Sequence, residues 1–262
     1  MHAVGPSSVV QQINDDLSKI AAWYCHNSLL VNPDKTKLMV LGTRQMLQKL
    51  PPDFHVTLLG KEATPASSAR DLRLQVDSNF SCDDHITKAA SLYLCQINRV
   101  RHLLDTRTLE NIINVMVFSR LYYCSAVWSS TSKKNISKLQ KVQNFAARII
   151  TNTRKFDHIT AVLKELGWLP VSSYLTYTVG ILAFKCVKEL APNYLCDRFA
   201  TRSVVHDRNT RKKDSLNIPG YKSASGQRTF LYRVITLWNS LPCAVTVADS
   251  SIPKEKTERI SL

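Results

Sequence analysis

The sequence predicts an α+β fold that is mostly α, in which a small β-element precedes a basic helical bundle. Short apolar and β-branched runs typical of strands are confined to residues 29–76. From residue 81 onward, apolar residues instead recur at the spacing of amphipathic helices. The chain has 262 residues, of which 44% are hydrophobic, so it is long and apolar enough to bury a core.

Positive charge is concentrated in two segments of the chain. The formal net charge is +15, and residues 88–160 hold twelve Lys or Arg against three Asp or Glu. Residues 198–233 hold nine against two, so the rest of the chain is about neutral. A local positive field of this kind favours a polyanionic partner over an acidic small molecule. The alternative is a basic surface that only keeps the protein in solution.

An amphipathic helix is predicted over residues 8–26, beginning at a capping box on Ser8. Asp15 and Asp16 lie beside its apolar stripe, and each can meet Lys19 at i+4 or i+3. A two-metal catalytic site requires carboxylates that converge on one ion, which a helix does not provide. We therefore interpret this pair as the polar side of a helix rather than as a metal site.

Four short strands are predicted after this helix, from apolar runs bounded by turn residues. They are expected at residues 29–31, 38–41, 56–59 and 72–76. The first two would form a hairpin around the turn at residues 32–36. The last two would be joined by a polar segment at residues 60–70.

Helical periodicity and capping signals predict helices in the rest of the chain. They are expected at residues 81–100, 106–128, 133–150 and 229–241, with a short helix before Gly167 and another ending near Leu190. The segment 201–225 is expected to be a loop and the tail 250–262 to be disordered. These patterns divide the chain into three predicted domains, residues 1–80, 81–200 and 201–262.

The sequence lacks the common signatures of enzyme sites. No Gly-rich phosphate-binding loop occurs among its seven Gly, and its seven Cys form no CxxC pair, so we predict no metal site. No Ser/His/Asp set with a nucleophile elbow is present. The odd Cys count and the absence of an N-terminal apolar run predict an intracellular protein, nuclear or cytoplasmic, that is not secreted. No apolar run is long enough to cross a membrane.

Eight segments, in a fixed order along most of the chain, carry a resemblance to a known family. They are Trp23 with residues 27–39 (NSLLVNPDKTKLM), then 71–77 (DLRLQVD), 121–124 (LYYC), 139–148 (LQKVQNFAAR), 157–160 (DHIT), 167–171 (GWLPV), 191–195 (APNYL) and 238–242 (WNSLP). This series resembles the reverse transcriptases of non-LTR retrotransposons, of the LINE, jockey-like and chicken-repeat-like types. The first two segments are similar to the end of the palm, and the others to the thumb and C-terminal region.

The resemblance implies a role for each predicted domain. Residues 1–80 would be the C-terminal remnant of the palm and residues 81–200 a thumb-like helical domain. Residues 201–262 would form a basic loop, a terminal helix and a tail. The catalytic aromatic-Ala-Asp-Asp turn of the family is expected to lie before the first helix. Mg²⁺ would therefore belong to the complete enzyme, with no cofactor in this chain, and the fingers and the rest of the palm would be upstream partners.

Basic side chains on the predicted helices and loops are the candidate contacts to an RNA template and to an RNA–DNA or DNA duplex. They are Arg99, Arg101, Arg120, Lys133, Lys134, Lys138, Lys141, Arg148 and Arg154, with Arg208, Arg211, Lys212 and Lys213 as a second patch. The resemblance also makes Lys35 a candidate general acid toward the leaving pyrophosphate, the alternative being an exposed lysine in a turn. Arg73 stands where the family usually has Gly, and its Cβ is expected to disturb a turn that uses the conformational freedom of glycine.

The expected function is that of a fragment of an RNA-directed DNA polymerase of a non-LTR retrotransposon. Such a fragment would contribute template–primer binding and would lack the catalytic Asp-Asp turn. One alternative is a nucleic-acid-binding protein without polymerase activity that its host has retained. The other is the non-functional product of a pseudogene.

Overall fold

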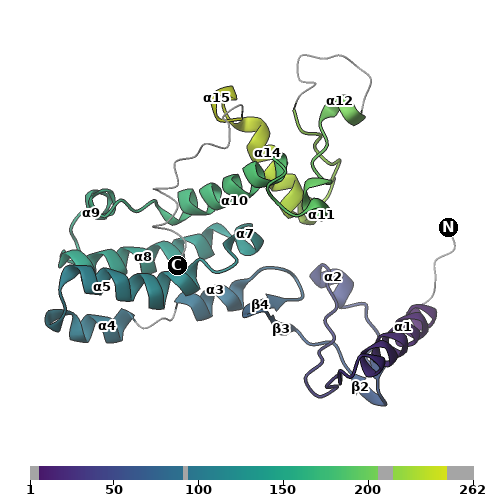
Figure 1. Ribbon diagram of the computed structural model, residues 1–262. Coiled ribbons are helices and arrows are strands. Elements are labelled where there is room, and N and C mark those ends of the chain that lie inside the picture. The colour runs from purple at the N-terminus through teal and green to yellow at the C-terminus, as the bar shows by residue number, and fades with distance from the viewer. Residues whose placement is uncertain (1–5, 91–93, 206–214, 247–262) are drawn as a thin grey trace. The chain divides into compact units, whose positions relative to one another are not determined.

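The computed structural model describes residues 6–90, 94–205 and 215–246, and it confirms a mostly helical α+β fold (Figure 1). The chain divides into two compact units, which are residues 1–85, here the N-terminal unit, and residues 86–262, here the helical unit.

The observed boundary follows residue 85, whereas the sequence placed it after residue 80. Residues predicted as a separate third domain pack into the helical unit. Leu216, Val234, Ile235 and Trp238 share a buried cluster with residues from a helix of the second predicted domain. The predicted tail at residues 250–262 lies outside the described residues.

Helix α1 (Pro6–His26) begins the N-terminal unit and confirms the first predicted helix. It starts at a proline, which is favoured in the first helical turn because the missing N–H would have no helical acceptor there. Ser8 therefore lies inside the helix rather than at its N-cap, so the predicted capping box is wrong. The Asn14 Oδ1 atom accepts a hydrogen bond of 2.9 Å from the Thr57 backbone N–H, which fixes α1 to the first hairpin.

Two antiparallel hairpins form the β-structure of this unit. They are β1 (Val56–Leu58) with β2 (Lys61–Ala63), and β3 (Ser68–Asp71) with β4 (Leu74–Asp77). The predicted strands near residues 56–59 and 72–76 are thus confirmed. The segment 60–70 is not a simple polar connection, because it supplies β2 and most of β3.

Each hairpin has a two-residue turn in which both residues adopt positive φ. In the first turn Leu59 and Gly60 have φ of 51° and 77°, and in the second Leu72 and Arg73 have φ of 42° and 69°. These signs are those of a type I′ turn, which matches the twist of paired strands and usually contains Asn and Gly. Arg73 thus has the positive φ that glycine adopts most easily, as expected, and the turn forms with arginine at this position.

The predicted hairpin over residues 29–41 is wrong. Within this described segment, the one strand-like pairing is an isolated parallel bridge between Leu38 and Pro65. The central turn is present, because Asn32 Oδ1 accepts hydrogen bonds from two backbone N–H groups that follow it. A short helix, α2 (Arg44–Leu47), comes next. Two brief apolar runs around a turn thus do not suffice to form a hairpin.

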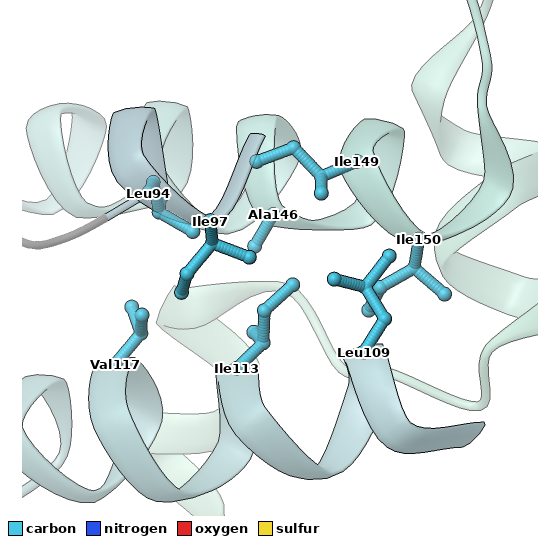
Figure 2. Packing of buried hydrophobic residues seen from close by; sticks show 8 residues of the cluster. All are labelled: Leu94, Ile97, Leu109, Ile113, Val117, Ala146, Ile149 and Ile150. Carbon is cyan, nitrogen blue, oxygen red and sulfur yellow. The ribbon is translucent and has the colours of Figure 1, made fainter. Parts of the chain in front are cut away.

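The first core of the helical unit lies between three helical segments. They are α4 (Leu94–Val100), α5 (Thr106–Ile113) with its π-helical extension η2 (Asn114–Phe118), and α8 (Lys133–Thr151). Figure 2 shows their side chains pointing toward one another, namely Leu94, Ile97, Leu109, Ile113, Val117, Ala146, Ile149 and Ile150. Helix α3 (Asp83–Ala90) precedes α4, and the 3₁₀ helix η1 (Arg101–Leu103) continues it.

The helix predicted over residues 106–128 is interrupted. After η2, helix α6 (Ser119–Leu121) ends in a turn where Cys124 has a left-handed φ of 49°, and α7 (Ser125–Trp128) follows. The Trp128 Nε1–H group donates a hydrogen bond of 2.8 Å to the Tyr123 carbonyl oxygen within this turn. The apolar spacing alone could not reveal the change in helix type, because a π-segment adds only one residue to a turn.

The second core is built on helix α10 (Val171–Val187), which packs against α8, α7 and α14. The other helices of this part are α9 (Ile159–Glu165), α11 (Asn193–Cys196), α12 (Arg202–Val205), α13 (Ala224–Gln227), α14 (Phe230–Ser240) and α15 (Cys243–Thr246). Arg233 on α14 donates to Ser129 Oγ at 2.6 Å and to the Ala126 carbonyl oxygen at 2.9 Å. Burial lowers the pKa of this guanidinium, whose bonds fix α14 to the end of α7.

We expect Arg73→Gly to stabilise the β3–β4 hairpin by about 1 kcal/mol, because a residue with a Cβ is strained at positive φ and glycine is not. Hydrogen exchange of the full chain measures this as slower exchange of the paired amides in β3 and β4.

Arg70→Gly is the matched control, because it removes the same side chain from an exposed strand position. It should speed exchange instead, since glycine weakens a strand interior by roughly 0.5–1 kcal/mol. Faster exchange in both variants would contradict the assignment of strain to the turn.

Candidate nucleic-acid interface

A concave surface on the helical unit gathers several of the predicted basic residues. We call it the basic groove, and it has a volume of about 510 Å³. Its lining residues are Asn98, Arg101, Lys141, Asn144, Phe145, Arg148, Ile149, Thr153 and Lys155. Four of the nine carry a positive charge and none carries a negative charge, which gives the groove a positive potential.

Helix α8 supplies most of the groove through one of its faces. Lys141, Asn144, Phe145 and Arg148 occupy positions i, i+3, i+4 and i+7, which lie above one another on an α-helix. Ile149, next along the helix, belongs to the core shown in Figure 2, so the groove lies directly beside that core.

Residues on either side of α8 complete the groove. Asn98 comes from α4 and Arg101 from η1, where the chain leaves the α4 axis. Thr153 and Lys155 come from the loop that follows α8. The helix ends at Asn152, which has a left-handed φ of 52°, and this backbone turns the loop away from the helix axis.

Arg148 holds that loop against the helix. Its Nε–H group donates to the Arg154 carbonyl oxygen at 3.1 Å, and its Nη2 group donates to the Asp157 carbonyl oxygen at 3.1 Å. The Asp157 carboxylate in turn accepts a hydrogen bond of 3.0 Å from the Arg154 backbone N–H. Lys155 and its neighbours are therefore presented by a hydrogen-bonded turn rather than by an unsupported loop.

Described acidic side chains do not neutralise the cations of the groove. In the described part of the chain, the ion pairs are Lys19 with Asp16, His55 with Glu62, and Lys61 with Asp34, all in the N-terminal unit. No described carboxylate pairs with the four cations of the groove. Like charges on facing walls of a concave surface reinforce one another, so the positive potential is highest inside the groove.

The structure brings together only part of the predicted contact set. Arg101, Lys141 and Arg148 line the groove, and Arg154 lies in the loop beside it. Exposed but outside the lining are Arg99, Arg120, Lys133 and Lys134, while Lys138 donates to Thr87 Oγ1 at 3.4 Å. The second predicted patch, Arg208, Arg211, Lys212 and Lys213, lies outside the described residues.

Sequence reasoning missed Lys155 and Phe145 as groove residues. Lys155 follows Arg154 directly, so the signal for it was a basic pair beside a helix end. An apolar ring on an amphipathic helix is expected to face the core, yet Phe145 is 37% exposed and lines the groove. The four-residue spacing from Lys141 was the available signal for its position.

A buried polar network lies behind the groove. Gln143 is 3% exposed, and its Nε2 group donates to the Leu169 carbonyl oxygen at 2.9 Å and to the Tyr122 hydroxyl at 3.2 Å. The Gln140 Oε1 atom accepts a hydrogen bond of 2.8 Å from the Val171 backbone N–H, at the start of α10. These bonds fix α8 to two other segments of the unit.

Aromatic rings surround this network. The Phe118 ring meets that of Trp168 edge to face at 4.7 Å, and the Tyr122 and Tyr174 ring centroids are 4.0 Å apart. Burial, with a smaller contribution from Tyr174, raises the pKa of Tyr122 well above its usual value. The hydroxyl therefore stays neutral and serves as a hydrogen-bond acceptor for the amide described above.

Asp15 and Asp16 do not fit the metal pair of a polymerase. Asp15 Oδ1 accepts a hydrogen bond of 3.1 Å from Gln11, and Asp16 Oδ1 pairs with Lys19 at 3.0 Å. Adjacent residues of an α-helix diverge by about 100°, so the two carboxylates do not converge. The interpretation of this pair as the polar side of a helix is confirmed. Within the described ranges, no three His, Cys, Asp or Glu side chains gather in a way that could hold a metal ion.

Lys35 lies in the exposed turn after α1. Its backbone N–H donates to Asn32 Oδ1 at 3.2 Å, and its side chain is exposed. A small cavity of about 220 Å³ nearby is lined by Asp34, Thr36 and Lys37 among others, but not by Lys35. The candidate role of Lys35 as a general acid stays a prediction.

Comparison with protein-family models, with curated proteins and with solved structures gives no match for this chain. None of the helices in the described part of the chain combines the length and apolar character that a membrane span requires.

We expect Gln143→Ala to lower the free energy of unfolding by about 1–3 kcal/mol, because it removes the hydrogen bonds that a buried side chain donates to the Leu169 carbonyl oxygen and to the Tyr122 hydroxyl. Urea unfolding followed by tryptophan fluorescence measures the change, since Trp128, Trp168 and Trp238 all lie in the helical unit.

Gln96→Ala on α4 serves as the control, because Gln96 is exposed on the same unit. Its effect should stay within about 0.5 kcal/mol. Equal effects of the two substitutions would show that the network does not stabilise the unit.

Proposed function

We propose that this chain is part of an RNA-directed DNA polymerase of the non-LTR retrotransposon type, and that its helical unit binds the template–primer duplex through phosphates. The observation that carries the proposal is the basic groove, in which Arg101, Lys141, Arg148 and Lys155 face one concave surface without a described acidic partner. Lys and Arg at such a site neutralise phosphates and release the counterions of the nucleic acid.

The dimensions of the groove suit a nucleic-acid strand. Lys141 and Arg148 are seven residues apart on α8, which corresponds to about 10 Å along the helix axis. Successive phosphates of one strand of B-DNA rise by about 3.4 Å, so this distance covers about three nucleotides. Contacts of this type set affinity and position without reading base sequence.

The location of the resembling segments also supports the proposal. Residues 121–124, 139–148 and 167–171 are separate in the sequence, yet Tyr122, Gln143 and Leu169 meet in the buried network. Three of the segments that resemble the polymerase thumb and C-terminal region therefore pack together. The groove lies on the helix that the second of these segments forms.

The direct test is binding of the full chain to a labelled RNA–DNA hybrid over a series of salt concentrations, beside a primer-extension assay with magnesium and nucleotides. The expected result is binding that weakens steeply with salt, without extension, because the one adjacent Asp pair near the N-terminus diverges. Extension would contradict the absence of a catalytic centre. A folded chain that fails to bind would contradict the function as a whole.

We expect the double variant Lys141→Gln/Lys155→Gln to weaken binding and to reduce the slope of log K against log salt by about 2, since each lost phosphate contact removes about 0.9. The side chains of Lys141 and Lys155 form no hydrogen bond in the described part of the chain, so their replacement leaves the groove intact. Fluorescence anisotropy with the labelled hybrid measures both changes.

The matched control is Lys164→Gln/Lys185→Gln, which removes the same charge from exposed positions of α9 and α10. Its effect on the slope should be close to zero. A similar loss of slope in both double variants would mean that the net charge, rather than the groove, is responsible for binding.

A further inference from the structure

Two aromatic side chains occur at the basic groove and have no role in phosphate contacts. Phe145 lines the groove, and Phe156 follows Lys155 in the adjoining loop. We propose that these two rings stack on unpaired bases, so that the groove binds single strands and duplex ends with an overhang more tightly than continuous duplex. This inference rests on the proposed function and specifies the substrate class of the same site.

Phe145 lies between the two cations that α8 contributes. Lys141 precedes it by four residues and Arg148 follows it by three, so all three share one helical face. Phe145 is 37% exposed in a groove that it lines together with Ile149 and four cationic side chains. A base that stacks there would place its flanking phosphates next to positive charges on both sides.

Phe156 is even more accessible, with 92% of its surface exposed. Lys155 Nζ lies 5.7 Å from the centroid of its ring, so the ring is directly beside a cation of the groove. The backbone on either side is fixed, because Arg148 donates to the carbonyl oxygens of Arg154 and Asp157. The turn keeps this apolar ring exposed to water, so a base that stacks on the ring would bury apolar surface.

The physical basis of selectivity is access to base faces. In a continuous duplex the bases already stack on one another, so phosphates, sugars and base edges can contact the groove but base faces cannot. In a single strand the base faces are available, and each base stacked on an aromatic side chain strengthens binding by about 5- to 150-fold. Cations alone bind both forms, whereas cations interspersed with aromatic rings favour the unpaired form.

The test uses the full chain and anisotropy with three labelled ligands of equal strand length. They are a single-stranded RNA, a blunt RNA–DNA hybrid, and the same hybrid with a short 3′ overhang. We expect Phe156→Ala to weaken binding of the single strand and of the overhang by about 5-fold or more, and of the blunt hybrid by less than about 2-fold. Phe156→Trp should restore the preference, because it restores a stacking face.

Further variants separate stacking from apolar packing. Phe145→Leu keeps the apolar volume in the helix but removes the aromatic face, and it should also reduce the preference for the single strand. Tyr194→Ala removes a ring that is 70% exposed elsewhere on the helical unit, and it should leave all three affinities unchanged.

The outcomes distinguish this inference from the proposed function. If the lysine double variant weakens every ligand while the Phe variants change nothing, or change all ligands equally, the stacking inference is overturned and the phosphate-binding function stands. If the chain binds none of the three ligands at low salt, both fail. A loss confined to ligands with unpaired bases supports the inference.

Discussion

The hydrogen bonds of Gln140 and Gln143 with Val171 and Leu169, at the start of α10 and just before it, are the constraint on which the helical unit depends. They fix the position of α8, the helix that contributes both to the first core and to the basic groove. A buried amide must find partners, so this network admits few arrangements of the surrounding backbone. The Gln143 bond to the Leu169 carbonyl oxygen fixes the position of α8 along its axis as well as its distance from Leu169, because a hydrogen bond is directional.

Because α8 serves two surfaces, stability and binding are coupled in this unit. Ala146, Ile149 and Ile150 enter the core, while Lys141 and Arg148 belong to the groove. The core therefore orients the cations before any ligand arrives. Side chains on a packed helix lose less conformational freedom on binding than side chains on a free loop. More of the interaction energy therefore appears as affinity.

Sequence patterns predicted the long elements well and the short ones poorly. Helices α1, α8 and α14 follow from apolar periodicity over many residues. Strands β2 and β3 were missed because each has only three or four residues, and because the turn at Leu72 and Arg73 lacks the usual Asn-Gly signal. Charge patterning identified three groove residues, but the groove itself also depends on the Arg148 contacts to carbonyl oxygens six and nine residues further along the chain, and backbone carbonyls carry no sequence signal.

The two units differ in how much of their structure is supported by burial. In the described part of the N-terminal unit, the buried hydrophobic side chains are Val56, Leu58, Leu74 and Cys82, whereas α1 leaves Ile20 and Trp23 49% and 59% exposed. Three buried clusters lie in the described part of the helical unit. Hydrophobic burial is the main source of folding free energy, so the helical unit has the larger share of it. The groove and the described hydrogen bonds that shape it lie within the helical unit, so the proposed binding draws on the part of the chain with the larger buried core.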